Sequence, residues 1–467
     1  MRDREQIAVL KVSLSVSKES EEILDGQSRI CNWLYNHLLE HANALREEYC
    51  KTQNPEIVKV LYTKRGLRDL IPTLKKENPF LKVVYSAPLK NAALRLSASI
   101  QTYQKSRRVK LGKKSGWPSF RSWKRNWFSL LYDEPNKGYR IQGNRLILSL
   151  GMGMDHKQRH LEVFFKEIKI FKDKEIRNLR IVKQEGVFYA VFTVRVIVPE
   201  LKKIEKALAL DPNHKNLAYG VGTDEQAIEI SSPSWLKKID KRIDECISKR
   251  DRCKKRSQKI ISSKASSYWI PSRRWAKFNR LVERLRRKRR EQTKTFLFTI
   301  AQALFKRYDL VAIGDYTPDG TGETKQMRRA MNNQSLIGRF KDVLSWVSLK
   351  SGKRFYEYDE KGTTRTCHVC GYVVEGGLSP EIREWECDAC TSSHIRDENA
   401  AKNGLKKVLR DLTLENLVPG SGLVLHKRWA WCARPSGVFT TLRGQCSDNV
   451  AAPRNSTKDM IVLDQNI

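Results

Sequence analysis

The chain has 467 residues, in which 89 lysines and arginines stand against 52 aspartates and glutamates, for a formal net charge of +37 at pH 7. This length predicts about two to four folded units with enough chain to bury a core. So large a positive charge predicts an anionic partner, and nucleic acid is the partner that it favours. A membrane surface is the alternative, but the sequence shows neither a secretory leader nor an apolar run of about 18 residues, so we expect no membrane partner.

The N-terminal part predicts a strand, a helical block and a basic aromatic segment, in that order. The strand is IAVLKVSLSV, and the helical block starts with SRICNWLYNHLLEHANALREEY and runs to about Arg108. The next segment, KLGKKSGWPSFRSWKRNWFSLLYD, interleaves basic residues with Trp117, Phe120, Trp123, Trp127 and Phe128. Such a mixture suits stacking on unpaired bases, although the same aromatic residues would also suit a protein core.

The middle of the chain changes from a small antiparallel β-unit, which ends near Pro199, to strands that alternate with long helices. This change predicts an α/β sheet from about residue 204 onward. Two basic helices are expected at about residues 234–261 and 272–307, and the second contains RLRRKRR, which suits a phosphate rail or a nuclear localisation signal. The polar segment PDGTGETKQMRRAMNNQS predicts a loop. The stretch after about Thr413 shows weak periodicity and predicts a flexible tail.

Four of the ten cysteines form two C-x2-C couplets separated by sixteen residues: Cys367, Cys370, Cys387 and Cys390. This spacing lets two knuckles close a tetrahedral thiolate site around one Zn²⁺ ion, so we expect a structural zinc ribbon. The other six cysteines have no such spacing, and the composition favours a reducing compartment.

Two aspartates are candidates for metal-dependent nuclease chemistry. Asp211 follows an apolar strand in LALDPNHKN, and Asp397 lies at a helix start in HIRDENAAKN. Converging carboxylates are what a site with two Mg²⁺ ions requires. Each aspartate also has a structural alternative, since Asp211 precedes Pro212 in a turn and Asp397 could cap a helix.

The motifs LALDPNHKN, KGTTRTCHVC, WECDAC and HIRDENAAKN, taken together, resemble those of the TnpB nucleases of bacterial insertion sequences. The eukaryotic Fanzor proteins and the compact type V CRISPR effectors share the arrangement. RICNWLYNHLL and GWPSFR are loosely similar to the early helix and the G-x-P-x-F segment of that family.

This resemblance implies a multidomain α+β fold, in which a β-barrel-like wedge domain carries an inserted helical recognition domain and precedes a RuvC-like nuclease domain of RNase H type. The expected boundaries are residues 1–24 and 109–203 for the wedge domain, 25–108 for the recognition domain, 204–366 and 391–412 for the nuclease domain, 367–390 for the zinc ribbon and 413–467 for the tail. Asp211 and Asp397 would be two of three catalytic carboxylates.

The third carboxylate of the family is a glutamate at the end of the middle strand, but here VAIGDY places Gly314 at that point. A subset of the family carries this glutamate elsewhere, just before the Thr pair and the zinc knuckle. The segment YEYDEKGTTRTC resembles that arrangement, with Glu360 at the corresponding point. Strand alternation would put Tyr356, Tyr358 and Glu360 on one face. We therefore predict Glu360 as the third ligand, with Asp315 and Glu384 as alternatives.

The resemblance predicts an RNA-guided DNA endonuclease that uses Mg²⁺ at Asp211, Glu360 and Asp397, with guide RNA and double- and single-stranded target DNA as partners. A guided binder that does not cut, acting as a repressor, and a zinc-ribbon transposition factor without guide RNA are the alternatives. The expected location is the bacterial cytoplasm at the nucleoid, or the nucleus in a eukaryotic host. Monomer and homodimer both stay open.

Overall fold

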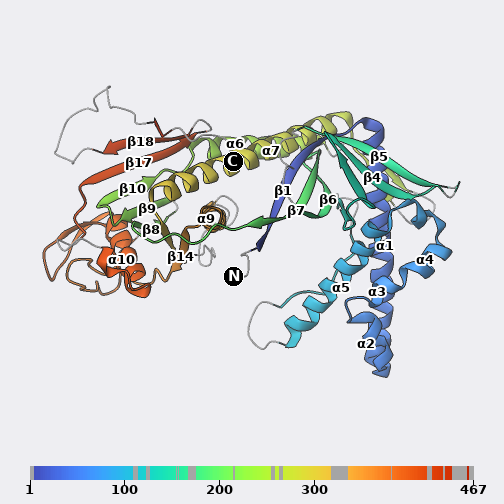
Figure 1. The fold of residues 1–467 in the computed structure, drawn as a ribbon, viewed down its shortest axis with the longest axis horizontal. Helices are drawn as coiled ribbons and strands as arrows, with labels where there is room; N and C mark the ends of the chain where they lie inside the picture. The colour runs from blue at the N-terminus through green and yellow to red at the C-terminus, as the bar shows by residue number, and fades with distance from the viewer. Residues whose placement is uncertain are drawn as a thin grey trace. The chain divides into compact units, whose positions relative to one another are not determined.

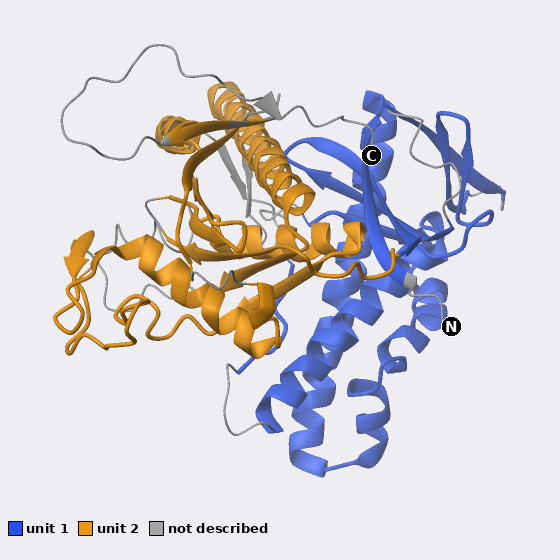
Figure 2. Cartoon of the chain, turned by 60° about the vertical axis from the view of Figure 1, so that its left-hand side comes forward, with its two compact units in different colours: residues 1–197 blue, residues 198–467 orange. Residues whose placement is uncertain are grey.

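The structure is a computed structural model. It describes residues 5–108, 114–121, 127–153, 155, 157–166, 175–213, 216–253, 258–261, 267–316, 335–379, 381–417, 423–434, 437–443 and 460–461. The chain divides into two compact units, residues 1–197 and 198–467, which are drawn in separate colours in Figure 2. Among the described residues, no helix is both long enough and apolar enough to cross a membrane. The predicted loop at residues 318–335, apart from Ser335, lies outside the described residues, and so does Trp123.

The first unit contains a seven-stranded sheet of order β2-β6-β7-β1-β5-β4-β3, in which all paired strands are antiparallel. Its strands are β1 (Glu5–Ser15), β2 (Ser129–Tyr132), β3 (Tyr139–Gln142), β4 (Arg145–Met152), β5 (Gln158–Phe165), β6 (Ile176–Gln184) and β7 (Val187–Ile197). β1 pairs with β7 from Glu5 to Ser13 and with β5 at Leu14 and Ser15, so one strand joins the two halves of the sheet. The result is a half-barrel, as the predicted fold class requires.

Helices are inserted between β1 and β2 of this sheet (Figure 1). They are α1 (Lys18–Thr52), α2 (Pro55–Leu61), α3 (Gly66–Asp69), α4 (Ile71–Glu77), the short 3-10 helix η1 (Pro79–Val83) and α5 (Ser86–Arg108). The Ser17 side chain caps α1 by accepting a hydrogen bond from the Ser20 N–H, so the helical insert begins earlier than the expected boundary at residue 25. The buried face of α1 repeats every three or four residues, at Leu24, Gln27, Cys31, Leu34 and Leu38, and its three leucines are fully buried.

The aromatic residues of the basic aromatic segment differ in their surroundings, since one packs against α1 and others are exposed and could stack on bases. Trp117 packs against α1, because its Nε1 donates to Asn43 Oδ1 at 2.8 Å and the Arg46 guanidinium lies 4.5 Å from its ring. Phe120 and Trp127 are instead 55% and 42% exposed. These two rings therefore stay available for stacking, whereas Trp117 contributes to the fold.

The second unit contains an eight-stranded sheet of order β14-β13-β8-β9-β10-β17-β18-β19. The strands are β8 (Ala207–Pro212), β9 (Ala218–Gly222), β10 (Gln226–Ile230), β13 (Leu310–Gly314), β14 (Arg354–Tyr358), β17 (Lys427–Arg434), β18 (Gly437–Arg443) and β19 (Met460–Ile461). β8, β13 and β14 are parallel neighbours, and β9 is antiparallel to both β8 and β10. Because parallel strands end at the same edge of a sheet, the carboxyl ends of β8, β13 and β14 lie together.

Helices cover both faces of this sheet, and each face has its own core. The helices are α6 (Ser234–Arg252), α7 (Arg273–Arg307), α9 (Ile337–Ser351), α10 (Arg396–Asp411) and the one-turn 3-10 helix η5 (Glu415–Leu417). α6, α7 and α9 supply buried residues to one face, and α10 supplies Ala401, Leu405 and Val408 to the other. α6 ends before the expected position near residue 261, because Gln258–Ile261 forms β11 and pairs with β12 (Ser267–Ile270).

The C-terminal region differs from the predicted flexible tail, since β17 and β18 extend the sheet beyond β10. β17 pairs in parallel with β10, Trp431 is only 1% exposed, and Trp429 Nε1 donates to Gln226 Oε1 at 2.7 Å. Without β17, the N–H and C=O groups along one side of β10 would form a bare sheet edge. The alternation in RWAWCA is too short to reveal this pairing by sequence periodicity.

A partly buried ion pair fixes the strand starts of this sheet and gives a stability prediction. Asp309 Oδ2 accepts from the N–H groups of Glu205 and Lys206, both at 3.2 Å, and Asp309 Oδ1 lies 3.1 Å from Lys353 Nζ. Burial alone would raise the pKa of Asp309, but Lys353 and the two N–H groups hold it below the ordinary value of 3.8.

Asp309→Asn is therefore expected to lower the free energy of unfolding at pH 7 by about 1 kcal/mol, allowing for solvent screening of this partly exposed site. The folded-state pKa is depressed, so this stabilisation is present above the unfolded-state pKa and is lost as the pH falls through the folded-state pKa. Urea unfolding at pH 7 and below pH 4 measures the difference, which should shrink in acid. An equal difference at both pH values would contradict the prediction.

Candidate active site and zinc ribbon

The carboxyl edge of the second sheet brings the first candidate residues together. Asp211 is near the end of β8, and Gly314 ends β13, where it pairs with Tyr358 of β14. The buried Tyr358 hydroxyl donates to Leu210 O at 2.9 Å, and the Asp315 N–H donates to Tyr358 O at 2.9 Å. These bonds hold the three strand ends in register beside Asp211.

The carboxylate of Glu360 lies in the space beside Gly314. A Cβ atom at position 314 would stand 2.3 Å from Glu360 Oε2, 3.2 Å from Glu360 Cβ and 3.1 Å from Pro212 Cδ. The Glu360 N–H donates to Asp315 Oδ1 at 3.2 Å, so the carboxylate of Asp315 supports the backbone of Glu360. Any side chain at position 314 would therefore require the Glu360 carboxylate to shift from this position.

Asp397 reaches the same edge from the first turn of α10. Asn213, two residues after Asp211, donates from Nδ2 to Asp397 Oδ2 at 3.2 Å, and Arg383 Nη1 lies 3.3 Å from the same oxygen. The side chain of Asp397 is 19% exposed. It does not cap α10, because the N-cap position is Ile395 and no side-chain capping bond forms there.

The acidic surroundings of this edge raise the pKa values of Asp211 and Glu360. Burial raises the pKa of Asp211, and the charges of Glu360 and Asp397 raise it further, to well above its ordinary value. Burial followed by the charge of Asp315 raises the pKa of Glu360 to about 7, against the opposing effects of Lys341 and the Tyr316 N–H. Among the described residues, no group donates a hydrogen bond to the buried Glu360 Oε2. Repelling carboxylates with an orphaned oxygen are the donor set that a hard cation such as Mg²⁺ satisfies.

The alternatives for the third ligand occupy different positions. Glu357, a neighbouring carboxylate that was not one of these alternatives, points to the face of the sheet covered by α9, where its Oε2 lies 3.1 Å from Lys341 Nζ. Tyr356 and Tyr358 point to the α10 face, in agreement with strand alternation. Glu384 is exposed on β15 (Glu384–Glu386), which pairs with β16 (Ser393–Ile395). The structure thus brings Glu360 and Asp315 to the sheet edge, and it places Glu384 in the ribbon hairpin.

The four predicted cysteines converge on one point. All their Sγ atoms lie within 4.8 Å of one another. Among the described residues, these cysteines form the cluster of three or more potential ligand atoms that could hold a metal ion. The Cys367–Cys390 and Cys370–Cys387 sulfur pairs are 3.7 and 3.6 Å apart. A tetrahedral Zn²⁺ site with Zn–S bonds of about 2.3 Å requires about 3.8 Å between sulfurs, whereas a disulfide requires about 2.05 Å. The cysteines therefore fit zinc and not a disulfide pair.

Two histidines that the cysteine spacing does not reveal support this centre. His394 is 5% exposed, and its Nε2 lies 3.1 Å from Cys367 Sγ. His368 follows Cys367, and its ring and backbone N–H both point at Asn399 Oδ1, at 3.1 and 2.9 Å. Burial followed by the charge of Lys402 lowers the pKa of His368 to about 4, so this ring is neutral. Partners of this kind orient the ligands of a metal.

One face of α10 fastens the segment that joins Glu360 to the first knuckle. Asn399 Nδ2 donates to Thr366 O at 2.8 Å, and Asn403 Nδ2 donates to Thr363 O at 2.8 Å. Lys407 Nζ donates to Asp359 O and Lys361 O at 2.9 and 2.8 Å. The spacing of four residues in NAAKN puts both asparagines on one helix face. α10 thus fixes the backbone on both sides of Glu360 as well as carrying Asp397.

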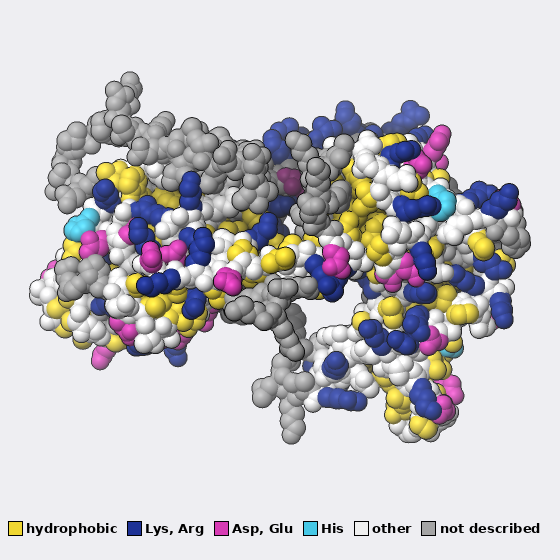
Figure 3. Space-filling model, in the orientation of Figure 1, with side chains coloured by type: hydrophobic (Ala, Val, Ile, Leu, Met, Phe, Trp, Pro, Cys, Tyr) yellow, Lys and Arg dark blue, Asp and Glu magenta, His cyan; other side chains and the backbone are white. Residues whose placement is uncertain are grey.

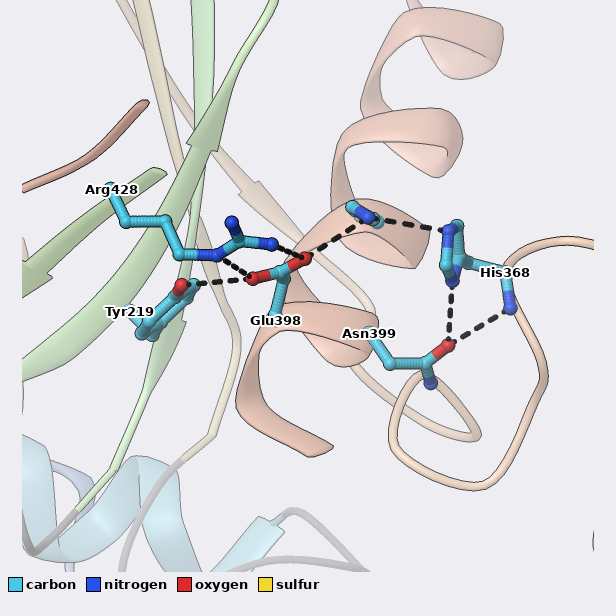
Figure 4. A network of polar contacts seen from close by, with 6 residues as sticks. Tyr219, His368, Glu398, Asn399 and Arg428 are labelled. Atoms are coloured by element: carbon cyan, nitrogen blue, oxygen red, sulfur yellow. Dashed lines mark hydrogen bonds and ion pairs between the residues drawn. The ribbon is translucent and has the colours of Figure 1, made fainter. Parts of the chain in front are cut away.

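A second buried group on α10, Glu398, faces the sheet (Figure 4). Its carboxylate accepts from Arg428 Nε at 3.0 Å, from Arg428 Nη2 at 3.2 Å and from the Tyr219 hydroxyl at 3.2 Å. Lys402, one turn along, lies 3.1 Å from it and 3.4 Å from His368 Nε2. Contacts therefore run continuously from β17 across α10 to the zinc ribbon.

Two family models match between residues 188 and 404. Residues 188–317 match the model described as a probable transposase of the OrfB, IS605 type, and residues 338–404 match the Cas12f1-like TNB domain. Over 157 residues, the chain is 29% identical to TnpB-like protein L79 of Acanthamoeba polyphaga mimivirus, covering 32% of this chain and 29% of that protein. Putative transposase R186 of the same virus is 34% identical over 131 residues, covering 27% of this chain and 26% of that protein.

The chain belongs to the superfamily of TnpB proteins and compact type V effectors. The superfamily predicted from the motifs is thereby confirmed. The alignments span less than a third of the length of these two mimivirus relatives. Among solved structures, a Cas12f1 complex with single guide RNA and target DNA aligns over 83% of this chain and 82% of that one, with a TM-score of 0.53 and 12% identity. This likeness concerns the fold, and it agrees with the predicted α+β organisation and a RuvC-like sheet that carries a four-cysteine ribbon.

Proposed function

We propose that this superfamily member is an RNA-guided DNA endonuclease whose catalytic carboxylates are Asp211, Glu360 and Asp397. The observation that carries the proposal is the position of Glu360, whose Oε2 lies where a side chain at Gly314 would begin. A glutamate supplied by the strand end of β14 therefore compensates for the missing carboxylate on β13. Asp315 has a different role in this proposal, because its carboxylate accepts from the Glu360 backbone.

The mechanism follows from the residues that line this edge. Asp211, Glu360 and Asp397 would hold Mg²⁺, which supplies an activated water and stabilises the leaving 3′ oxygen of the scissile phosphodiester. Asn213 and Arg383 hold the Asp397 carboxylate at two points, which restricts its rotation. The buried Tyr358 hydroxyl fixes the carbonyl next to Asp211. The chain thus pre-positions its ligands before any substrate arrives.

The proposed ribbon holds one structural Zn²⁺ through Cys367, Cys370, Cys387 and Cys390. Base pairing to the guide would select the target, while the protein would read a short flanking duplex motif. Both the net charge of +37 and the likeness to a nucleic-acid complex support nucleic acids as partners.

The α6–α7 pair is the proposed phosphate rail. Exposed basic residues recur on α7 at three- and four-residue spacing: Lys277, Arg280, Arg284 and Lys288. With a rise of about 1.5 Å per residue, they form a stripe about 16 Å long. Lys and Arg side chains gather along the edge over α6 and α7 in Figure 3. Arg289 is not part of the stripe, because its Nη2 pairs with Asp240 of α6 at 3.1 Å.

Arg284→Gln is expected to weaken guide RNA binding about threefold to tenfold and to reduce the slope of log affinity against log salt by about 1, because one phosphate contact is lost. Filter binding between 50 and 300 mM KCl measures both quantities. Lys350→Gln, at the exposed end of α9 outside the stripe, is the matched control. An unchanged salt slope in Arg284→Gln would remove this helix face from the interface.

The proposed function is tested by expressing the chain with the noncoding sequence that flanks its gene, sequencing the bound RNA, and offering matching DNA with Mg²⁺. Guided cleavage that Asp211→Ala abolishes supports the proposal. Guided binding without cleavage would mean that the protein is an RNA-directed DNA-binding factor. DNA binding without any copurified RNA would indicate a transposition factor that uses its zinc ribbon.

A further inference from the structure

We propose that Arg428, on the C-terminal strand β17, is a positioning residue that sets the place of Asp397 by anchoring the buried Glu398. The inference rests on the proposed function, because it treats Asp397 as a metal ligand. It assigns a role to a part of the chain beyond α10, where sequence analysis expected a flexible tail.

The contacts show why Glu398 needs a cation from outside its own helix. Glu398 is 6% exposed, and a buried carboxylate is tolerated only when it is paired and hydrogen-bonded. Lys402 pairs with it from the same helix, so this ion pair moves with α10 and cannot fix the helix against the sheet. Tyr219 comes from β9 but is neutral. Among the described residues, Arg428 is the charged side chain of the sheet that reaches Glu398, and it does so through two nitrogen atoms.

The geometry of these two bonds restricts both rotation and sliding of α10. A bidentate guanidinium–carboxylate pair fixes an orientation as well as a distance. Glu398 directly follows Asp397 on one rigid helical turn, so any rotation that moved Glu398 would also move Asp397 from Asn213. In Figure 4 the Arg428 side chain extends from its strand toward Glu398, at the opposite end of the network from His368.

β17 is itself held independently of α10. Arg428 pairs in register with Ala227 of β10, and Trp431, three residues on, is 1% exposed in the core on the opposite face from α10. Trp429 adds its bond to Gln226. β17 therefore holds Arg428 in a fixed position relative to the sheet. The position of Asp397 relative to Asp211 then depends on a segment outside the three carboxylate motifs.

The test compares Arg428→Gln with Lys427→Gln, an exposed neighbour on the same strand whose loss changes the net charge equally. Mn²⁺ affinity is measured on the purified full chain by electron paramagnetic resonance, and guided cleavage is titrated with Mg²⁺ at saturating RNA. Loss of such a supporting partner typically costs about 10- to 100-fold in metal affinity or activity, so Arg428→Gln should shift both titrations by that factor. Lys427→Gln should leave both titrations unchanged, and guide RNA affinity should be equal in the two variants.

A thermodynamic cycle separates positioning from a general loss of stability. In a Glu398→Gln background, Arg428→Gln should have less than a third of its effect on Mn²⁺ affinity, because the charge that it anchors is gone. Arg428→Lys retains the charge without the two-point geometry, so its Mn²⁺ affinity should lie between those of wild type and Arg428→Gln.

Wild-type Mn²⁺ affinity in Arg428→Gln, or additive effects in the cycle, would overturn the proposal, and so would an equal loss in Lys427→Gln. Failure of the wild-type chain itself to bind Mn²⁺ and cut guided DNA would instead overturn the proposed function, and with it the premise of this inference.

Discussion

Glu360→Gln is expected to lower guided DNA cleavage by about a thousandfold or more, while guide RNA binding stays at the wild-type level. Glutamine keeps the shape of the side chain but removes the negative charge that a Mg²⁺ ligand must supply, and a thousandfold loss corresponds to about 4 kcal/mol of transition-state stabilisation. Single-turnover cleavage at saturating RNA and Mg²⁺ measures the effect. Asp315→Asn is the comparison, because Asp315 lies beside Glu360 and accepts its N–H. Full activity in Glu360→Gln with a large loss in Asp315→Asn would assign the third ligand to Asp315.

The same site allows a second experiment, in which one substitution should restore activity that another removes. Gly314→Ala alone should impair cleavage, because its Cβ would stand 2.3 Å from Glu360 Oε2 and displace that carboxylate. Gly314→Glu combined with Glu360→Gly should recover part of the activity that Glu360→Gly loses, since the combination returns a carboxylate to the end of β13 and vacates its space. Recovery at a level above both single variants is the expected outcome. A double variant no better than Glu360→Gly would argue against equivalence of the two positions.

The sequence was most informative where spacing alone specifies chemistry. The two couplets around Cys367 and Cys387 predicted the converging sulfurs, since a C-x2-C knuckle needs no distant partner to present its ligands. Asp211 and Asp397 could be proposed as candidates because a strand end and a helix start are local features. The superfamily followed from the combination of these motifs with HIRDENAAKN.

The rest depended on contacts between distant segments. Nothing in VAIGDY shows that Glu360 fills the space beside Gly314, because that contact requires the register of β13 on β14. The role of β17 was hidden for the same reason, since its pairing with β10 joins residues about two hundred positions apart. Glu398 and Asn399 read as ordinary polar residues of a helix start, and only the folded α10 shows one facing the sheet and the other facing the ribbon.

Cys387→Ser is expected to release the zinc and to lower guided cleavage at least about a hundredfold, because the ribbon supports two of the three carboxylates. Cys387 is 1% exposed, and its Sγ lies 3.6 Å from Cys370 Sγ. Replacing this thiolate with the serine hydroxyl would leave only three thiolates to hold the ion. Loss of the knuckles would free Arg383 from Asp397 and His368 from Asn399, and it would loosen the Thr363–Thr366 segment that follows Glu360.

Metal analysis should give one zinc per wild-type chain and much less in Cys387→Ser, and amide hydrogen exchange should accelerate in residues 359–368. Cys50→Ser is the matched control, since Cys50 is exposed on α1 in the other unit and should retain both zinc and cleavage. Zinc loss that leaves cleavage and exchange at residues 359–368 unchanged would mean that α10 alone holds Glu360 and Asp397 in place. The asparagine and lysine bonds from α10 to that segment would then suffice without the ion, which would confine the zinc to the fold of the ribbon itself.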